Sequence, residues 1–281
     1  MTGSPRVVVG FDGSPDSVLA LEWALAEASL RDATIDLCHV RKQPGTADDN
    51  GGVSDLGGEV LTQGLEHADR WSPHVRVAAR LVSGNPAQQL PRIAADALFL
   101  VVGARGAGGF RGLRLGSVSD QVVRHAQCPV VVVPDPGTRR GGTRERKIVV
   151  GVDGSAGSEA ALAFAFDEAD RRQAELCAIH VFDPSTVQIM AGLPQADLRR
   201  LHLAASETLS SLLEPHMTKY PSVHACDEVL SGAPAATLTA AASGAELLVL
   251  GSRGHGGFVT LLLGSTSHSV LHHASCPVAV A

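Results

Sequence analysis

The sequence predicts an α/β protein of two tandem doubly wound domains, each built on a five-stranded parallel sheet. Runs such as VVVG at 7–10 and LFLVVG at 98–103 are continuously apolar, as expected for strands that helices cover on both faces. These runs alternate with helical patterns, and the whole arrangement occurs twice. With 281 residues, the chain has room for about two domains with their own cores.

The repeat defines the domain boundaries. VVVGFDGS at 7–14 matches IVVGVDGS at 148–155, and HAQCPV at 125–130 matches HASCPV at 273–278. The offset between the copies changes once, from 141 to 148 residues, after the second strand of each copy. We therefore expect domains at 1–135 and 147–281, joined by a flexible linker at 136–146 that is rich in Gly and Arg.

The elements of the first copy follow from its apolar runs and turn residues. Strands are expected at 6–11, 34–40, 75–82, 98–103 and 130–134, and helices at 15–30, 54–71, 86–96 and 117–126. Pro91 lies inside the third helix, where we expect it to kink the helix or delay its start.

The second copy repeats this order. Strands are expected at 147–152, 175–182, 223–230, 246–251 and 277–281, and helices at 156–172, 195–216, 234–243 and 265–274. In a doubly wound sheet, ligands bind outside the carboxyl ends of the strands, near the point where the strand order reverses.

A glycine-rich loop follows the fourth strand of each copy. Gly103-x-x-Gly106, nine residues and Gly116-Ser117 recur as Gly251-x-x-Gly254, nine residues and Gly264-Ser265. Glycines let the backbone approach an anion, and the helix that follows offers unpaired N–H groups with partial positive charge. Neither loop has the Lys-Ser/Thr ending of a Walker loop, and neither follows the first strand as a dinucleotide fingerprint does.

This spacing, late in each copy, resembles the nucleotide-binding loop of the universal stress protein family, whose ATP-binding members carry G-2x-G-9x-G-(S/T). The resemblance covers nearly the whole chain as two tandem copies, of the actinobacterial kind. It implies a Rossmann-like fold of the adenine nucleotide alpha hydrolase type, and ATP as the ligand, with Mg²⁺ or Mn²⁺. No residue of the chain is assigned as a metal ligand or as a catalytic group.

The resemblance also implies which residues contact the nucleotide. In the first copy these are Gly10, Asp12, Val40, Gly103, Arg105, Gly106, Gly108, Gly109, Gly116, Ser117, Val118 and Ser119; in the second they are Gly151, Asp153, Val181, Gly251, Arg253, Gly254, Gly256, Gly257, Gly264, Ser265, Thr266 and Ser267.

Several of these positions have an alternative interpretation. Asp12 and Asp153 end the first strands and would accept hydrogen bonds from ribose hydroxyls, but Asp-Gly-Ser before a helix is also a turn and N-cap signature. Arg105 and Arg253 can meet phosphate charge or be ordinary exposed loop residues.

Other positions flank the expected contacts. Ser117 and Ser265 are expected to donate a hydroxyl and to cap the following helix. Val40 and Val181 end the second strands, where the family reads adenine through backbone groups. The adjacent His39 and His180 are interpreted as packing residues.

Composition narrows the class of protein. A net charge of −6 without a basic face disfavours nucleic-acid binding, and no apolar run approaches the roughly 18 residues that a membrane span needs. MTGSPRVVVGFDGS enters a strand without the apolar core of a signal peptide, and the five cysteines lack CxxC spacing. We therefore expect a cytoplasmic protein with reduced thiols.

The expected function is that of a regulatory module in stress or dormancy responses, switched by nucleotide occupancy. The alternative is an enzyme, either a slow ATPase or autophosphorylating protein or an adenylyl-transfer enzyme of the same broad fold. The fifth strands, 129–134 and 277–281, are short, apolar edge strands. In the resembling family such strands align antiparallel in dimers, so we expect the two copies to pair within the chain through them. A homodimer of whole chains is also open.

Overall fold

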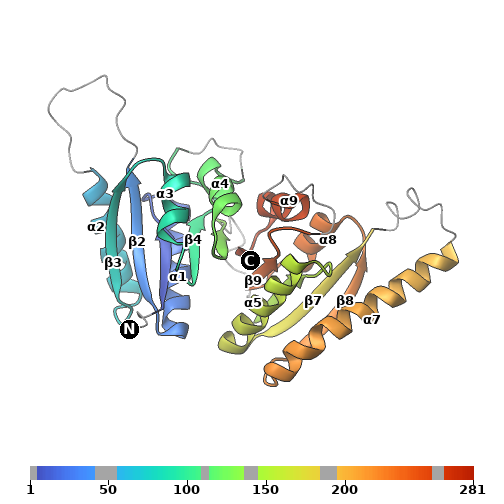
Figure 1. Ribbon diagram of the computed structural model, residues 1–281. Helices are drawn as coiled ribbons and strands as arrows, with labels where there is room; N and C mark the ends of the chain where they lie inside the picture. The colour runs from blue at the N-terminus through green and yellow to red at the C-terminus, as the bar shows by residue number, and fades with distance from the viewer. Residues whose placement is uncertain (1–4, 42–55, 109–113, 136–144, 184–194, 255–262) are drawn as a thin grey trace. The chain divides into compact units, whose positions relative to one another are not determined.

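The computed structural model describes residues 5–41, 56–108, 114–135, 145–183, 195–254 and 263–281 (Figure 1). The chain divides into two compact units, residues 1–135 and 136–281, each with its own helices and sheet. Among the described residues, no helix combines the length and the apolar character that crossing a membrane requires.

The first unit alternates strands and helices along its whole length. Its elements are β1 (Arg6–Gly10), α1 (Pro15–Arg31), β2 (Thr34–Arg41), α2 (Leu56–Trp71), β3 (Val77–Ser83), α3 (Pro86–Ile93), β4 (Phe99–Gly103), α4 (Ser117–His125) and β5 (Val130–Val133). The strands are parallel and follow the order β3-β2-β1-β4-β5. The chain therefore winds in both directions from β1, as predicted for a doubly wound sheet.

The second unit has the same construction. Its elements are β6 (Lys147–Gly151), α5 (Ala156–Arg172), β7 (Glu175–Phe182), α7 (Gln195–Lys219), β8 (Ala225–Ser231), α8 (Pro234–Ala241), β9 (Leu247–Leu250), α9 (Ser265–His273) and β10 (Val278–Val280). Its strands are parallel in the order β8-β7-β6-β9-β10.

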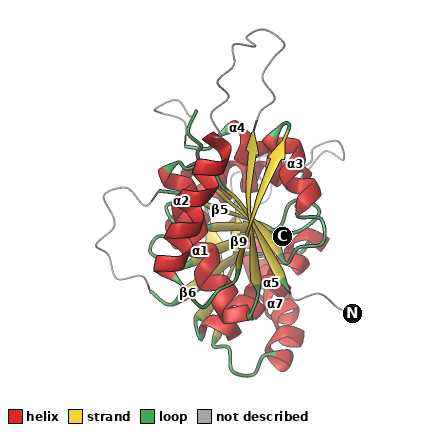
Figure 2. Ribbon diagram, turned by 90° about the vertical axis from the view of Figure 1, so that its left-hand side faces the viewer, coloured by secondary structure: helices red, strands yellow, loops and turns green. Residues whose placement is uncertain are grey.

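Helices cover both faces of each sheet (Figure 2). In the first unit α1 and α2 pack on one face, and α3 and α4 on the other; in the second, α5 and α7 lie opposite α8 and α9. The central strands are buried throughout, from Val7 to Val9 and from Phe99 to Val102. Burying each such side chain contributes about 1.5–3 kcal/mol, which explains why these strands are apolar on both faces.

The first helix of each unit has matching ends. Ser14 and Ser155 are the N-caps, and their side chains accept hydrogen bonds from the N–H groups of Ser17 and Ser158. Each helix ends at a residue in the left-handed conformation, Asp32 in α1 and Gln173 in α5. Both helices are 17 residues long, and the same kinds of cap begin and end them.

Two prolines, Pro91 and Pro215, lie inside helices of the structure. Pro91 does not delay the start of α3, because the helix begins at Pro86, where Asn85 caps it through a hydrogen bond from the N–H of Ala87. The helix ends at Ile93, three residues earlier than predicted. Helix α7 continues past Pro215 to Lys219, three residues beyond the predicted end.

Candidate functional site

Each unit has a cleft at the carboxyl ends of its central strands. The strand order reverses between β1 and β4, and between β6 and β9, so the loops after these strands diverge to opposite faces of the sheet. The clefts measure about 440 Å³ in the first unit and about 400 Å³ in the second. Both volumes lie within the roughly 300–1,000 Å³ of typical small-molecule sites.

The residues singled out from the sequence come together in these clefts. The first is lined by Gly10, Asp12, Val40, Gly103, Arg105, Gly106, Gly108, Gly116, Ser117, Val118 and Ser119, and the second by Gly151, Asp153, Val181, Gly251, Arg253, Gly254, Gly264, Ser265, Thr266 and Ser267. Gly109, Gly256 and Gly257 lie outside the described residues.

Asp12 joins the turn after β1 to the glycine-rich loop after β4. Its Oδ1 accepts a hydrogen bond from the N–H of Ser14 at 3.1 Å, and its Oδ2 accepts one from the N–H of Ala107 at 2.8 Å. Asp153 forms the same turn, accepting from the N–H of Ser155 at 3.0 Å. The helix N-cap is the serine and not the aspartate, so each carboxylate remains on the cleft wall.

The glycines are required by contacts within the protein. A β-carbon at Gly106 would lie 2.5 Å from Oδ2 of Asp12, and one at Gly103 would lie 2.6 Å from the backbone carbonyl of Asp16 in α1. In the second unit, a β-carbon at Gly251 would lie 2.6 Å from the carbonyl of Gly157. We attributed these glycines to anion approach, and the structure adds a tight fit between the loop and the first helix.

Helices α4 and α9 open into the clefts without a capping side chain. The N-caps are Gly116 and Gly264, so the prediction that Ser117 and Ser265 cap these helices was wrong. The first N–H groups of such a helix have no partner within the helix and carry partial positive charge. The hydroxyl of Ser119 does not donate into the cleft, because it donates to the carbonyl of Gly103 at 2.7 Å.

The twin arginines differ in their partners. Arg105 donates from Nε and Nη2 to the carboxylate of Asp16, at 3.2 and 3.3 Å, and lies 3.7 Å from Asp135. The hydrogen bonds and negative charge of Asp16 raise the pKa of Arg105 further. In the second unit Gly157 stands in place of Asp16, and no hydrogen bond or ion pair joins the Arg253 side chain to another described residue.

The histidines beside the cleft tie the second strand to the first. Nδ1 of His39 lies 2.8 Å from the carbonyl oxygen of Phe11, and Nδ1 of His180 lies 2.8 Å from that of Val152. Because a carbonyl only accepts, Nδ1 is the donor in both cases. Both rings therefore have a structural hydrogen bond, and His39 also lines the first cleft.

Sequence reasoning missed the apolar floor. Leu90 of α3 and Leu238 of α8 line the clefts of their units, next to Pro86 and Pro234 at the helix starts. The repeated Gly-x-Pro at 84–86 and 232–234 was the available signal, since a helix that begins there starts at the carboxyl edge of the sheet. These leucine side chains add apolar surface to the lining of each cleft.

Comparisons with known proteins agree with this architecture. The model of the universal stress protein family matches residues 4–134 and again 145–281. "Universal stress protein Rv2623" of Mycobacterium tuberculosis is 33% identical over 289 residues, covering 98% of this chain and 95% of the relative. "Universal stress protein Rv2005c" of the same species is 36% identical over 297 residues, covering 98% and 96%.

The solved structures show the same fold. The crystal structure of a universal stress protein from Archaeoglobus fulgidus superposes with a TM-score of 0.68 at 23% identity, covering 98% of this chain and 95% of that one. The duplicated family match and the full-length relatives together establish that this chain belongs to the universal stress protein family, with two tandem domains.

Proposed function

We propose that each unit binds one adenine nucleotide, most favourably ATP with Mg²⁺ or Mn²⁺, and that occupancy switches the protein between regulatory states. The observation that carries this proposal is the uncapped N-terminus of α4, and of α9, opening into a cleft at the strand-order reversal. Unpaired N–H groups beside a glycine-rich loop favour phosphate.

The phosphates would lie against the backbone of 116–119 and 264–267. The helix N-terminus carries roughly half a positive charge there, and no side chain of the N-cap competes for its N–H groups. Micromolar affinity requires about 8 kcal/mol of binding free energy, which the phosphates and the nucleoside must supply together.

The nucleoside would occupy the opposite side of the cleft. Val40 and Leu90 provide apolar surface for the base, and Asp12 has a carboxylate on the wall that can accept from a ribose hydroxyl. Val181, Leu238 and Asp153 occupy the same places in the second unit. The cleft thus separates an apolar end from an anion-binding end.

The chain offers little direct ligation to a divalent cation. Among the described residues that line the clefts, Asp12 and Asp153 are the carboxylates, one per cleft, and Asp12 already accepts two N–H groups. Mg²⁺ keeps several water ligands and binds phosphate oxygens readily, so the cation would be held mainly by the nucleotide.

The same geometry favours a binding module over an enzyme with rapid turnover. Fast phosphoryl transfer requires an oriented water or hydroxyl and neutralisation of charge on the transferring group. The cleft carboxylates already accept backbone N–H groups, Asp12 from Ser14 and Ala107 and Asp153 from Ser155, which leaves them less available to orient a water molecule. The net charge of −6 supports the further proposal that the protein has no nucleic-acid partner, and five cysteines without CxxC spacing support the proposal of a cytoplasmic location.

Calorimetry on the full chain tests the proposal. We expect two equivalents of ATP per chain in the presence of Mg²⁺, and no binding after Gly116→Val and Gly264→Val are combined. Absence of heat with ATP, ADP and AMP, with and without divalent cations, would contradict it.

A further inference from the structure

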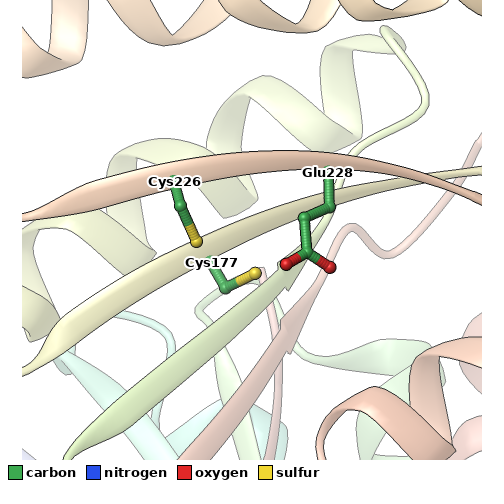
Figure 3. Close-up of side chains that lie close together, drawn as sticks. All are labelled: Cys177, Cys226 and Glu228. Carbon is green, nitrogen blue, oxygen red and sulfur yellow. The ribbon is translucent and has the colours of Figure 1, made fainter.

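A second group of chemically reactive side chains lies in the second unit, away from the cleft. Cys177 of β7 and Cys226 of β8 are register partners in adjacent parallel strands, and Glu228 follows two residues along β8 on the same face. The two sulfur atoms and a carboxylate oxygen all lie within 4.8 Å of one another. Figure 3 shows the three side chains directed toward one another.

We propose that Cys177, Cys226 and Glu228 form a binding site for a thiophilic divalent cation of the Zn²⁺ class, with water as the fourth ligand. Zn²⁺ is bound by thiolate sulfur at about 2.3 Å and by carboxylate oxygen at about 2.0–2.2 Å in a tetrahedral arrangement. Ligands of such an ion lie about 3.7 Å apart, so inward movements of about 1 Å complete the site.

The surroundings give a hydrated ion access to this site. Cys177 is buried, whereas Cys226 and Glu228 are exposed. Glu228 borders an open depression of about 580 Å³ under the small side chains of α8, from Ala236 to Ala241. Water in this depression can reach an ion held by the three side chains and complete its coordination.

The first unit provides an internal comparison at the same place in the sheet. Asp36 and Ala78 are the corresponding register pair, and Arg80 corresponds to Glu228. Asp36 is paired there with Arg6 at 2.6 Å and with Arg80 at 3.6 Å, so opposite charges neutralise each other. The fold therefore does not require thiols at this position.

In the second unit a carboxylate, Glu228, stands where the first unit has the positive charge of Arg80. Glu228 has no ion pair with a described residue, and the cation acting on the thiols is Lys147 at the start of β6. Burial raises the pKa of the Cys177 thiol to about 12, and the hydrogen bond with Cys226 and the charge of Glu228 act in the same direction. Binding a metal ion would displace the thiol protons and neutralise the carboxylate.

The site is independent of the proposed nucleotide sites. Cys177 precedes Val181 by four residues of the same strand, or about 13 Å toward its amino end. An experiment without nucleotide therefore tests the metal site alone, and its failure would leave the nucleotide proposal unaffected.

Cobalt titration of the reduced, metal-stripped full chain provides the test. We expect one equivalent of Co²⁺ with thiolate-to-cobalt charge-transfer absorption, displaced by Zn²⁺. Cys226→Ser and Cys177→Ser should each remove most of this absorption, and Glu228→Gln should weaken binding at least about tenfold, since even outer-shell partners cost that much. Cys128→Ser, which removes a thiol of the first unit, is the matched control and should leave the spectrum unchanged.

Circular dichroism of each cysteine variant should match that of the wild type, so that a lost absorption reports a lost ligand and not a loss of folding. Absence of the absorption in the reduced wild type, or its persistence in Cys226→Ser, would overturn the proposal. So would formation of a Cys177–Cys226 disulfide with diamide, detected by mass, in a protein whose reduced form does not bind Co²⁺, because the pair would then act as a redox couple only.

Discussion

Gly116 and Gly264 are the residues at which the loop meets the helix in each unit. A β-carbon at Gly116 would lie 3.3 Å from the carbonyl oxygen of Ala104, so a valine there would displace the loop as well as cover the helix N-terminus. We expect Gly116→Val to abolish ATP binding in the first unit and leave one equivalent per chain. Gly264→Val is its matched control and should remove the other equivalent. Two unaltered equivalents in both variants would contradict the site assignment.

The twin arginines lead to a second prediction. Arg105 is held by Asp16, whereas Gly157 replaces this aspartate in the second unit, and no described residue forms an ion pair with Arg253. We therefore expect Arg253→Ala to reduce ATP affinity about tenfold or more, or about 1.4 kcal/mol, and Arg105→Ala to have a smaller effect. AMP affinity should change little in either variant, because the extra phosphates make the difference.

Calorimetry would separate the two arginines if each is measured with the opposite cleft blocked by its glycine-to-valine substitution. Asp16→Asn keeps hydrogen-bond acceptance but removes the charge, so it should increase the ATP affinity of the first cleft. Equal losses from the two alanine variants would show that Asp16 does not restrain Arg105.

At the scale of elements, two side chains of the turn after β1 contact the loop after β4: Asp12, and Ser14, whose hydroxyl donates to the carbonyl of Arg105 at 3.4 Å. Asp12 accepts from Ser14 and from Ala107, which lies 95 residues away in the sequence. Asp12→Ala should therefore weaken nucleotide binding by about 1–3 kcal/mol and also increase amide exchange in the described part of the loop near Ala107. Weaker binding without faster exchange would assign Asp12 to the ligand alone.

Local patterns predicted the elements well, and the reasons are visible at particular residues. Continuous apolar runs predicted the central strands. The predicted starts of three helices, at residues 15, 86 and 156, agree with the structure, in which Ser14, Asn85 and Ser155 are the N-caps. Helix ends were less accurate: α3 ends at Ile93, three residues before its predicted end, and α7 continues to Lys219, three residues beyond its predicted end.

The sequence predicted which residues line the clefts, but it did not predict which of them contact one another or contact other elements. The duplicated spacing predicted that the glycines of each copy line one cleft, but the clash that excludes a side chain at Gly103 comes from Asp16 in helix α1. The Arg105–Asp16 pair joins residues 89 positions apart. The cluster of Cys177, Cys226 and Glu228 likewise depends on strand register, which the sequence alone does not specify.

At the scale of the whole molecule, the association of the units remains a prediction. β5 and β10 end the strand order of their sheets, at Val130–Val133 and Val278–Val280. We expect these strands to pair with each other, because an apolar edge exposes unpaired N–H and C=O groups. Hydrogen exchange should then protect every amide of both strands, whereas the opposite edge strands β3 and β8 should show alternating protection. Alternating protection in β5 and β10 as well would show that the units meet elsewhere.

Turnover of the whole chain is the remaining prediction. We expect ATP hydrolysis well below one per second, compared with about ten per second for a typical enzyme, because the cleft carboxylates are already held by backbone N–H groups. Phosphate release from purified protein would measure it. A rate at the typical value, lost in Asp12→Asn and Asp153→Asn, would place the protein among enzymes.

Gly157 in place of Asp16 has a consequence for signalling range. Two sites of equal affinity fill over the same interval of ligand concentration, and the singly occupied chains are then an equal mixture of the two half-filled forms. If one arginine is restrained and the other is available, the two clefts fill at different ATP concentrations. A single polypeptide then passes through empty, half-filled and full forms in a fixed order. Because the two domains are fused in one polypeptide, every chain would contain one site of higher ATP affinity and one of lower ATP affinity.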